Sequence, residues 1–323
     1  MKNYHFVTNQ LLQRYINMKN KKNIYSVSRN ISLFMLVLFS FDIHADYSNH
    51  IKSKDVINEL VNEHGFKESY VIEVLKNAKR RDEMLKSVAK PAEKTKTWDD
   101  YKAIFIKKKR IRDGKKFINE NIKTLERAEK EFGVSKEVIT AILGVETNFG
   151  SNKGSYKVID SLTTLGFDDP RRSKFFRSEL IQFFLLTREN NLDIFKIEGS
   201  YAGAMGYAQF ISSSYRAYAI DYDGDGYVDL FNSVDDAIGS IANYLKVHGW
   251  KREGSIVVKT YPNNVRKFYK PHKSLTQFIP LTFTENGEEL HFIGDDNFRA
   301  IARYNISDVY AMAVYYLSEE FKK

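Results

Sequence analysis

Glu146 is the side chain whose sequence neighbours best suit a general acid. It ends an apolar helical segment and lies shortly before a glycine break at Gly150. A carboxyl group in this position is partly desolvated, which raises its pKa. A raised pKa is what a carboxylic acid needs to donate a proton near neutral pH. A surface glutamate at a frayed helix end is the alternative, and it is the commoner case for an isolated Glu.

A second group of residues, 199–210, combines small side chains with two polar ones. It is not a phosphate-binding loop, because no Lys-Ser/Thr follows its glycines and no clear strand precedes them. Small residues let the backbone approach a ligand or another helix closely. Ser200 and Gln209 are then polar groups on a crowded wall. Tight helix packing is the alternative, and the two interpretations are compatible.

A third group places carboxylates at alternate positions, as in a calcium-binding loop. Asp221, Asp223 and Asp225 are followed by Gly226, which matches the first six positions of an EF-hand. Alternate carboxylates can converge on a hard cation, the glycine permits the sharp turn, and Tyr227 would offer its carbonyl oxygen. The sequence therefore predicts a calcium site.

The end of this loop departs from the EF-hand pattern. Position 12 is Asn232 rather than the usual bidentate Glu. Asp235 or Asp236 could supply the closing carboxylate from the next helix. An acidic surface turn without a metal is the alternative.

The elements that would position these groups are mostly helices. Apolar residues recur at helical spacing through residues 46–145, with a break from Pro91 to Lys96. Within this region, 97–130 is expected as charged helix. The helix of Glu146 is expected to begin after Ser135 as N-cap and to end near Gly150 as C-cap. Further helices are expected at 173–192, 199–220, 234–248 and 307–321.

Residues 251–298 differ in composition pattern, with Val, Ile, Thr and Phe in short runs and a Glu285-Asn286-Gly287 turn. This pattern predicts short strands and a hairpin. The expected class is α+β, mainly α. The expected division is 46–250 as the helical region with the loop 221–236, 251–300 as a small β domain, and 301–323 as a return to the helical body.

Charge and cysteine content narrow the class further. The chain has no cysteine, which excludes disulfides, thiolate metal sites and a lipid-modified Cys. Its net charge is +9, but residues 1–45 hold six Lys and Arg against one Asp, which leaves +4 for the remainder. A nucleic-acid binder usually concentrates its charge more strongly, so no nucleic-acid partner is expected.

The first 45 residues predict export. An 11-residue apolar run, 31–41, follows basic residues and precedes Ala45, the pattern of a cleaved signal peptide. The true start could be Met18, which lies closer to the apolar run. An uncleaved anchor is the alternative. With cleavage near Ala45, no membrane anchor remains and the mature protein is expected in the periplasm.

Six ordered blocks together resemble the lytic murein transglycosylase B family (glycoside hydrolase family 103). The resemblance covers almost the whole mature chain, and the blocks keep the family's order and spacing. They are GVETNFG at 144–150, PRRSKFF at 170–176, GSYAGAMGYAQF at 199–210, DYDGDGYVDL at 221–230, DAIGSIANYLKVHGW at 236–250 and ARYNISDVYAMAV at 302–314. Ser213 departs from the family, which often has Pro there, and the β segment is shorter than in the best-known members.

The resemblance implies a lysozyme-like catalytic core, a surrounding helical region and a small β domain. It implies that Glu146 is the one catalytic acid/base. By position, it further implies substrate-binding roles for Ser200, Gln209, Tyr304, Asn305, Tyr101, Arg172, Tyr244 and Tyr310. It implies a calcium set of Asp221, Asp223, Asp225, the Tyr227 carbonyl and Asp236, which favours Asp236 over Asp235.

The implied reaction cleaves the β-1,4 bond between N-acetylmuramic acid and N-acetylglucosamine in peptidoglycan. Glu146 first donates a proton and then accepts one, which leaves a 1,6-anhydromuramoyl end without consuming water. Ordinary glycosidases use two carboxylates, and Asp160, Asp168 and Asp169 lie close enough in sequence to supply a second. A hydrolytic muramidase and a non-catalytic, calcium-stabilised wall-binding module are therefore the alternatives. No organic cofactor is expected.

Overall fold

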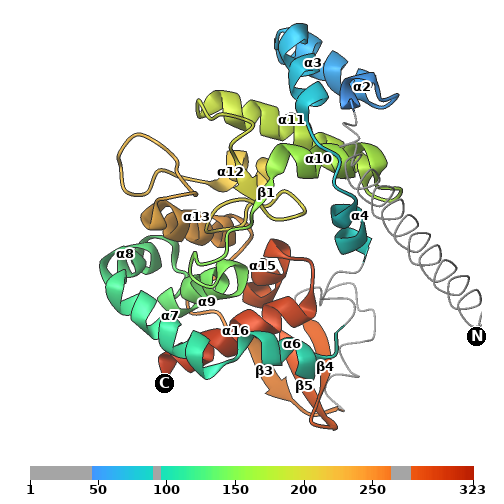
Figure 1. The fold of residues 1–323 in the computed structure, drawn as a ribbon. Helices are drawn as coiled ribbons and strands as arrows, with labels where there is room; N and C mark the ends of the chain where they lie inside the picture. The colour runs from blue at the N-terminus through green and yellow to red at the C-terminus, as the bar shows by residue number, and fades with distance from the viewer. Residues whose placement is uncertain (1–45, 90–95, 263–277) are drawn as a thin grey trace, which may run out of the picture. The chain divides into compact units, whose positions relative to one another are not determined.

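The computed structural model describes residues 46–89, 96–262 and 278–323, so the predicted signal peptide lies outside the described residues. Helices dominate the described chain, and two small sheets accompany them (Figure 1). The expected mainly α class is thereby confirmed. The first helices are η1 (Tyr47–Asn49), α2 (Ser53–Asn58), η2 (Glu59–Glu63), α3 (Glu68–Asn77), α4 (Asp82–Ala89), α6 (Trp98–Phe105), α7 (Lys108–Glu120) and α8 (Ile122–Phe132).

The second half of the chain alternates helices with short strands. Its helices are α9 (Lys136–Thr147), α10 (Val158–Asp168), α11 (Ser173–Glu189), α12 (Ser212–Tyr218), α13 (Val234–Val247), α15 (Asp296–Tyr304) and α16 (Asp308–Lys322). Its strands are β1 (Tyr156–Lys157), β2 (Glu198–Gly199), β3 (Val257–Thr260), β4 (Ile279–Glu285) and β5 (Glu288–Gly294). The expected helices at 173–192, 234–248 and 307–321 correspond to α11, α13 and α16.

Helix α9, which carries Glu146, is the central element. Every residue from Val138 to Gly144 is buried, because apolar or small side chains occupy all faces of the helix. A helix that is apolar all round is stable only when other elements cover it on every side. Helix α16 packs most extensively against α9, and α7, α8 and α13 also contact it.

The end of α9 differs from the expectation. The helix ends at Thr147, and its cap is Asn148 in the left-handed region, with φ of 50°, followed by Phe149 with φ of 59°. The predicted glycine cap at Gly150 is therefore wrong. Gly150 is instead needed within the turn after the helix, because its φ is 85° and a Cβ there would lie 1.9 Å from the Tyr207 ring.

The charged segment 97–130 is not one helix but three. Between α6 and α7 the chain is extended at Lys107, with φ of −114° and ψ of 143°. Between α7 and α8 it leaves helical geometry at Asn121, whose side-chain amide donates to the carbonyl of Phe117. Such a side-chain bond competes with the helical pattern and ends α7.

Residues 199–211 form a loop rather than the start of a helix, so only Ser212–Tyr218 of the predicted 199–220 is helical. Gly203, Gly206 and Gln209 all have positive φ, between 48° and 83°, which a right-handed helix cannot contain. A Cβ on Gly206 would lie 2.3 Å from the carbonyl oxygen of Leu230. The loop therefore follows the backbone of the segment after the aspartate loop.

The predicted strands and hairpin are confirmed. The three-stranded antiparallel sheet has the order β3-β5-β4, and Asn286 and Gly287 form its turn with positive φ at both positions. This is the residue pair that a two-residue hairpin favours. The hairpin is fastened to α6, because Trp98 Nε1 donates to Glu285 at 3.0 Å and Lys102 Nζ lies 2.6 Å from the same carboxylate. The domain boundaries at residues 250 and 300 stay predictions.

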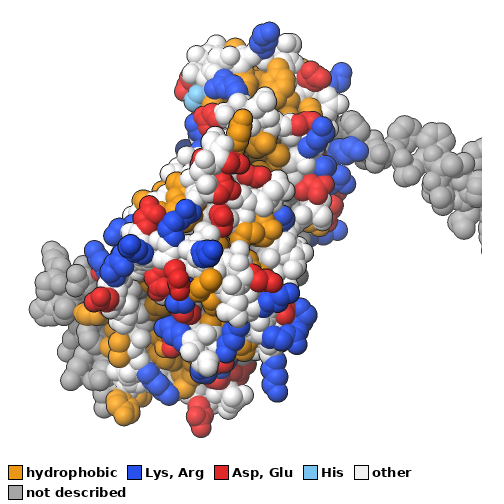
Figure 2. Space-filling model, turned by 90° about the vertical axis from the view of Figure 1, so that its left-hand side faces the viewer, with side chains coloured by type: hydrophobic (Ala, Val, Ile, Leu, Met, Phe, Trp, Pro, Cys, Tyr) orange, Lys and Arg blue, Asp and Glu red, His pale blue; other side chains and the backbone are white. Residues whose placement is uncertain are grey.

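Surface charge is mixed on the face that Figure 2 shows, where basic and acidic side chains are interspersed. Within the described ranges, no helix is both long enough and apolar enough to cross a membrane.

Leu143 tests the central position of α9, since its side chain is completely buried. Leu143→Ala should lower the free energy of unfolding by about 2–5 kcal/mol, because it leaves a cavity between packed helices. The control is Val247→Ala on α13, whose side chain is 59% exposed and should change stability by less than about 0.5 kcal/mol. Urea unfolding measures both, and equal losses would contradict this account of the core.

Candidate active site

Glu146 and Tyr310 form the centre of the site. Glu146 lies in the last turn of α9 and is half-buried, whereas Tyr310 lies in the first turn of α16 and is 2% exposed. The Tyr310 hydroxyl donates to Glu146 Oε1 at 2.6 Å. This short bond joins residues 164 positions apart. The neutral tyrosine hydroxyl thus binds Oε1 and fixes the orientation of the carboxyl group.

Tyr304 lies beside this pair. Its ring is stacked at 13° to that of Tyr310, with centroids 6.5 Å apart, and its hydroxyl donates to the carbonyl of Ala208 at 2.6 Å. Burial, and next the charge of Glu146, raises the pKa of both tyrosines well above the usual value. Both phenols therefore stay protonated and act as hydrogen-bond donors throughout the physiological range.

A groove of about 1110 Å³ reaches this cluster at Tyr304. Helix α4, the start of α11, the loop 202–211 and the α15–α16 connection contribute to its walls. Five predicted substrate-binding residues lie on these walls, namely Arg172, Gln209, Tyr244, Tyr304 and Asn305. The structure thus brings together residues that are far apart in sequence, while their contact with substrate stays a prediction.

Tyr244 packs against Tyr304 within the groove wall. The two rings meet edge to face with centroids 4.8 Å apart, and the Tyr244 hydroxyl donates to the carbonyl of Arg303 at 2.7 Å. Burial raises the pKa of Tyr244 to about 12. His248 stacks on the other side of Tyr244 at 4.0 Å between centroids. Aromatic packing therefore fixes the place of Tyr304 against Glu146.

The two polar residues of the loop 199–210 are both held by backbone. Ser200 Oγ accepts from the amides of Ala202 and Ala204, at 3.3 and 3.0 Å, and Ala202 lines the groove. Gln209 Nε2 donates to the carbonyls of Gly206 and Lys153, at 2.9 and 3.1 Å. Both side chains therefore stabilise the loop conformation.

Two other predicted residues lie at the edges of the site. The Arg172 guanidinium lies over the ring of Phe175, 4.3 Å from its centroid, and is exposed at the groove. Tyr101 is 2% exposed in α6, with its ring 5.0 Å from that of Phe105. It lies close enough to Tyr310 to raise the pKa of that residue slightly, and it is not among the residues that line the groove.

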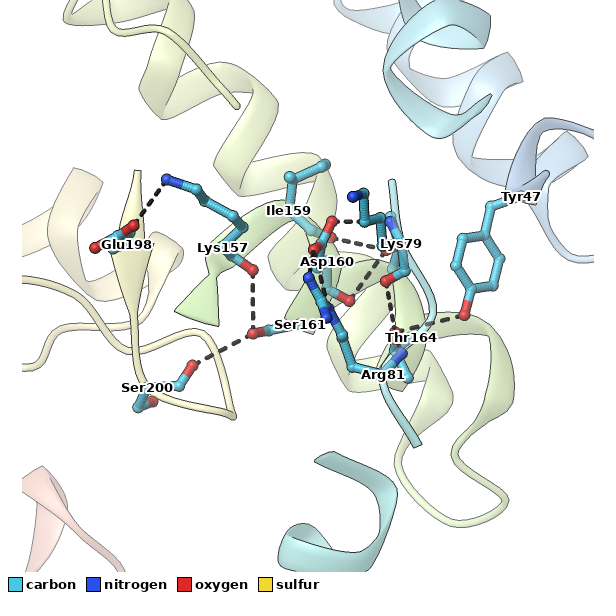
Figure 3. Close-up of polar contacts among 11 residues, drawn as sticks. Tyr47, Lys79, Arg81, Lys157, Ile159, Asp160, Ser161, Thr164, Glu198 and Ser200 are labelled. Carbon is cyan, nitrogen blue, oxygen red and sulfur yellow. Dashed lines mark hydrogen bonds and ion pairs between the residues drawn. The ribbon is translucent and has the colours of Figure 1, made fainter. Parts of the chain in front are cut away.

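The three carboxylates considered as a second catalytic acid are engaged elsewhere. Asp160 is buried and accepts from the Lys79 amide at 2.8 Å and from the Arg81 guanidinium at 3.3 Å (Figure 3). Asp168 accepts from the Tyr47 hydroxyl at 2.8 Å. Asp169 accepts from two backbone amides at the start of α11. Each one fastens a connection to α10 or α11.

Figure 3 also shows how α10 supports the site. Its Ser161 hydroxyl lies 3.2 Å from the carbonyl of Lys157 and 3.4 Å from that of Ser200. One side of α10 thus holds the segment 79–81 that leads into α4, and another lies against the loop 199–210.

The aspartate loop brings three of its predicted ligands together. Asp221, Asp223 and Asp236 can each place an oxygen within 4.8 Å of the others. Asp225 is not part of this group, and its Oδ1 accepts from the Tyr227 amide. The ligand roles of Asp225 and of the Tyr227 carbonyl stay predictions.

Asp236 is the buried member of this cluster. Its carboxylate accepts from the amides of Tyr222, Asp223 and Asp229, at 2.7, 3.2 and 2.7 Å. Burial, and to a lesser degree the charge of Asp223, raises its pKa, although the backbone hydrogen bonds oppose this shift. Converging carboxylate oxygens with unfavourable burial and repulsion suit a hard divalent cation.

Sequence reasoning missed several groove residues. Arg303 and Asp308 line the groove from either side of the predicted Tyr304-Asn305 pair. Their adjacency to that pair was the available signal. Glu179, a buried carboxylate that accepts from the Ser213 amide and hydroxyl, was also missed. This contact explains why Ser213 suits its position, because Pro would lack the amide hydrogen.

A mainly helical fold, with a half-buried glutamate in the tyrosine cluster that a groove reaches at Tyr304, suits a lysozyme-like, glycan-cleaving class of enzyme. A family described as the transglycosylase SLT domain matches residues 49–319. The membrane-bound lytic murein transglycosylase B of Escherichia coli (strain K12) is 36% identical over 302 residues, covering 85% of this chain and 83% of that protein.

Solved structures agree with these matches. The soluble lytic transglycosylase SltB1 of Pseudomonas aeruginosa is 40% identical, covers 84% of this chain and 98% of its own, and has a TM-score of 0.77. The Escherichia coli lytic transglycosylase Slt35 in complex with calcium is 34% identical, covers 87% and 96%, and also has a TM-score of 0.77. The chain belongs to the lytic murein transglycosylase B family and is a peptidoglycan-cleaving enzyme.

The raised pKa values of Tyr304 and Tyr310 predict a specific alkaline sensitivity. The unfolded chain releases these protons above about pH 10, whereas the folded protein retains them. The free energy of unfolding should therefore receive their full contribution below pH 10 and fall as pH rises. Each tyrosine contributes up to about 1.4 kcal/mol per pH unit to this slope.

Urea unfolding between pH 8 and 11 measures the slope. Tyr304→Phe with Tyr310→Phe should make it shallower, and Tyr261→Phe, at a 78% exposed position, serves as control. An unchanged slope in the double variant would show that these phenols do not retain their protons.

Proposed function

We propose that Glu146 performs both proton transfers of a lytic transglycosylase reaction. Its protonated carboxyl donates to the oxygen that joins N-acetylmuramic acid to N-acetylglucosamine, and the C1–oxygen bond of muramic acid breaks. The resulting carboxylate removes the proton from the 6-hydroxyl of the same sugar, whose oxygen bonds to C1. Glu146 is thereby protonated again at the end of the reaction, and the product is a 1,6-anhydromuramoyl end.

The observation that carries this proposal is the Tyr310–Glu146 hydrogen bond of 2.6 Å. A donor fixed to Oε1 orients the carboxyl group, which would then exchange protons with a sugar bound in the groove. Because Tyr310 has a pKa raised by burial, it does not compete as a proton donor to substrate. One oriented carboxyl group that alternates between acid and base meets the requirement of the reaction.

We infer that the substrate's own 2-acetamido group stabilises the positive charge that develops at C1. Asp160, Asp168 and Asp169 have structural partners, which supports the substrate's own 2-acetamido group in this role. Ser200 would help to orient that group from the loop 199–210. The groove residues Arg172, Gln209, Tyr244, Tyr304 and Asn305 would bind the flanking sugars, with Tyr101 and Tyr310 behind them.

We further propose that the enzyme acts in the periplasm, where the predicted signal peptide of residues 1–45 would deliver it. Its substrate, the peptidoglycan glycan strand, lies in that compartment. We also propose a division into a catalytic helical body and a small β domain. In the structure, the sheet β3-β5-β4 contacts α6 and α15.

Calcium would be a structural ion in this enzyme. The oxygen donors of Asp221, Asp223 and Asp236 fit it, with Asp225 and the Tyr227 carbonyl as the remaining ligands. When bound, the ion would neutralise the clustered carboxylates and brace the turn before α13. The calcium complex of Slt35 supports this assignment.

Glu146→Gln tests the catalytic proposal most simply. The amide can still accept the Tyr310 hydrogen bond, but it cannot donate and recover a proton, so release of soluble fragments from purified sacculi should fall by about 10³-fold or more. Glu137→Gln, in the first turn of the same helix, is the matched control and should remain active. Unchanged lysis by Glu146→Gln would exclude Glu146 as the acid. Reducing ends in the products, instead of anhydro ends, would favour hydrolysis.

Asp223→Asn tests the calcium proposal. For the natural protein, calcium at about 100 times its Kd should add about 2.7 kcal/mol of stability and raise the Tm, and a chelator should reverse this. Asp223→Asn should lose most of that gain, because one converging carboxylate is neutral. Asp235→Asn, which changes the neighbour of Asp236 outside the cluster, should keep it. A Tm of the natural protein that is indifferent to chelator would contradict the site.

A further inference from the structure

Thr147 follows the proposed catalytic residue directly and closes α9. Its side chain is 1% exposed, so it is too deeply buried to touch a substrate in the groove. A buried threonine at a helix end usually bonds only to a carbonyl of its own helix. Thr147 does more than this, since its hydroxyl lies where three segments of backbone meet.

The Thr147 hydroxyl accepts from the amide of Gly150 at 2.9 Å. The same oxygen lies 3.2 Å from each of two carbonyl oxygens, those of Leu143 and Tyr207, so the hydroxyl can donate its one hydrogen to either. One small side chain therefore joins the last turn of α9, the left-handed turn after it, and the loop 199–210. An isosteric apolar side chain would make none of these bonds.

The loop that Thr147 reaches is itself fixed. The Tyr207 amide donates to the carbonyl of Leu230 at 2.8 Å, and Lys153 Nζ lies 4.3 Å above the Tyr207 ring. Two residues later, Gln209 enters the groove wall with its amide bonded to Lys153 and Gly206. The backbone around Tyr207 is thus held by Leu230 on one side and by Thr147 on the other, and the same loop contributes Gln209 to the groove wall.

We propose that Thr147 is a positioning residue, which fixes the Glu146 carboxyl against the groove through its bonds to Tyr207 and Gly150. The inference rests on the proposed role of Glu146 and adds a second requirement to it. Tyr310 orients the carboxyl from α16, and Thr147 fixes the helix end that carries it. A displacement near 1 Å at this point is enough to cost about 100-fold in rate.

The same helix offers a matched control. Thr140 is also completely buried, but its hydroxyl has no hydrogen-bond partner among the described residues. Thr140→Val and Thr147→Val make the same chemical change in one helix. They differ in whether the lost hydroxyl joins α9 to the loop 199–210.

Steady-state cleavage of a defined glycan oligomer tests the proposal, with rates normalised to the folded fraction. Thr147→Val should lower kcat about tenfold or more while KM changes less than about twofold, because catalysis and not binding depends on the alignment. Thr147→Ser, which keeps the hydroxyl, should restore most of kcat. Thr140→Val should match the natural enzyme.

A binding measurement in the inactive Glu146→Gln background separates positioning from general damage. Adding Thr147→Val to that variant should leave its Kd for the glycan oligomer unchanged, as only the carboxyl is displaced. A kcat of Thr147→Val close to that of the natural enzyme would overturn the proposal. Equal loss in Thr147→Ser, or weakened glycan binding in the double variant, would also overturn it. Full activity of Glu146→Gln would instead overturn the proposed function.

Discussion

The hydrogen bond from Tyr310 to Glu146 depends on how two helices distant in sequence pack together. Helix α9 is buried on all sides, and its most extensive neighbour is α16, the last helix of the chain. The strands β3, β4 and β5 and helix α15 all lie between α9 and α16 in sequence. They must therefore fold before the Tyr310 hydroxyl can bind the Glu146 carboxyl. Assembly of the site is thus inseparable from completion of the fold.

The surrounding structure serves to keep this pair in place without filling the groove. Tyr304 and Tyr244 build an aromatic stack on one side, and the loop 199–210 forms the other. That loop is fastened below by the segment after the aspartate cluster and beside by Ser161 of α10. A cation at Asp221, Asp223 and Asp236 would therefore influence the site through the backbone that it braces.

Much of this arrangement could be predicted from local sequence. The apolar stretch of α9, the hairpin turn at Asn286-Gly287 and the alternate aspartates each carry their structure in a few adjacent residues. Boundaries that depend on distant contacts were predicted wrongly. Residues 199–211 contain helix-compatible side chains, but Gly206 meets the Leu230 carbonyl so closely that the backbone takes a left-handed turn. Nothing near Gly206 in sequence indicates that contact.

In the site too, some residues could be predicted from sequence, whereas others depend on contacts between distant segments. Position within a family pattern placed Arg172, Gln209, Tyr304 and Asn305 at one groove. The bonds of Thr147 were missed, because they follow from backbone geometry that no single-sequence pattern encodes. Asp160, by contrast, was a plausible second acid until the Lys79 and Arg81 contacts showed its structural use.

In the proposed reaction, one carboxyl group transfers both protons, and no water molecule attacks C1. Digestion of purified sacculi in heavy-oxygen water, with immediate reduction of the products and mass spectrometry, tests it directly. The account predicts 1,6-anhydromuramoyl ends that carry no heavy oxygen. Reduced muramic acid ends with heavy oxygen at C1, formed in step with cleavage, would contradict it.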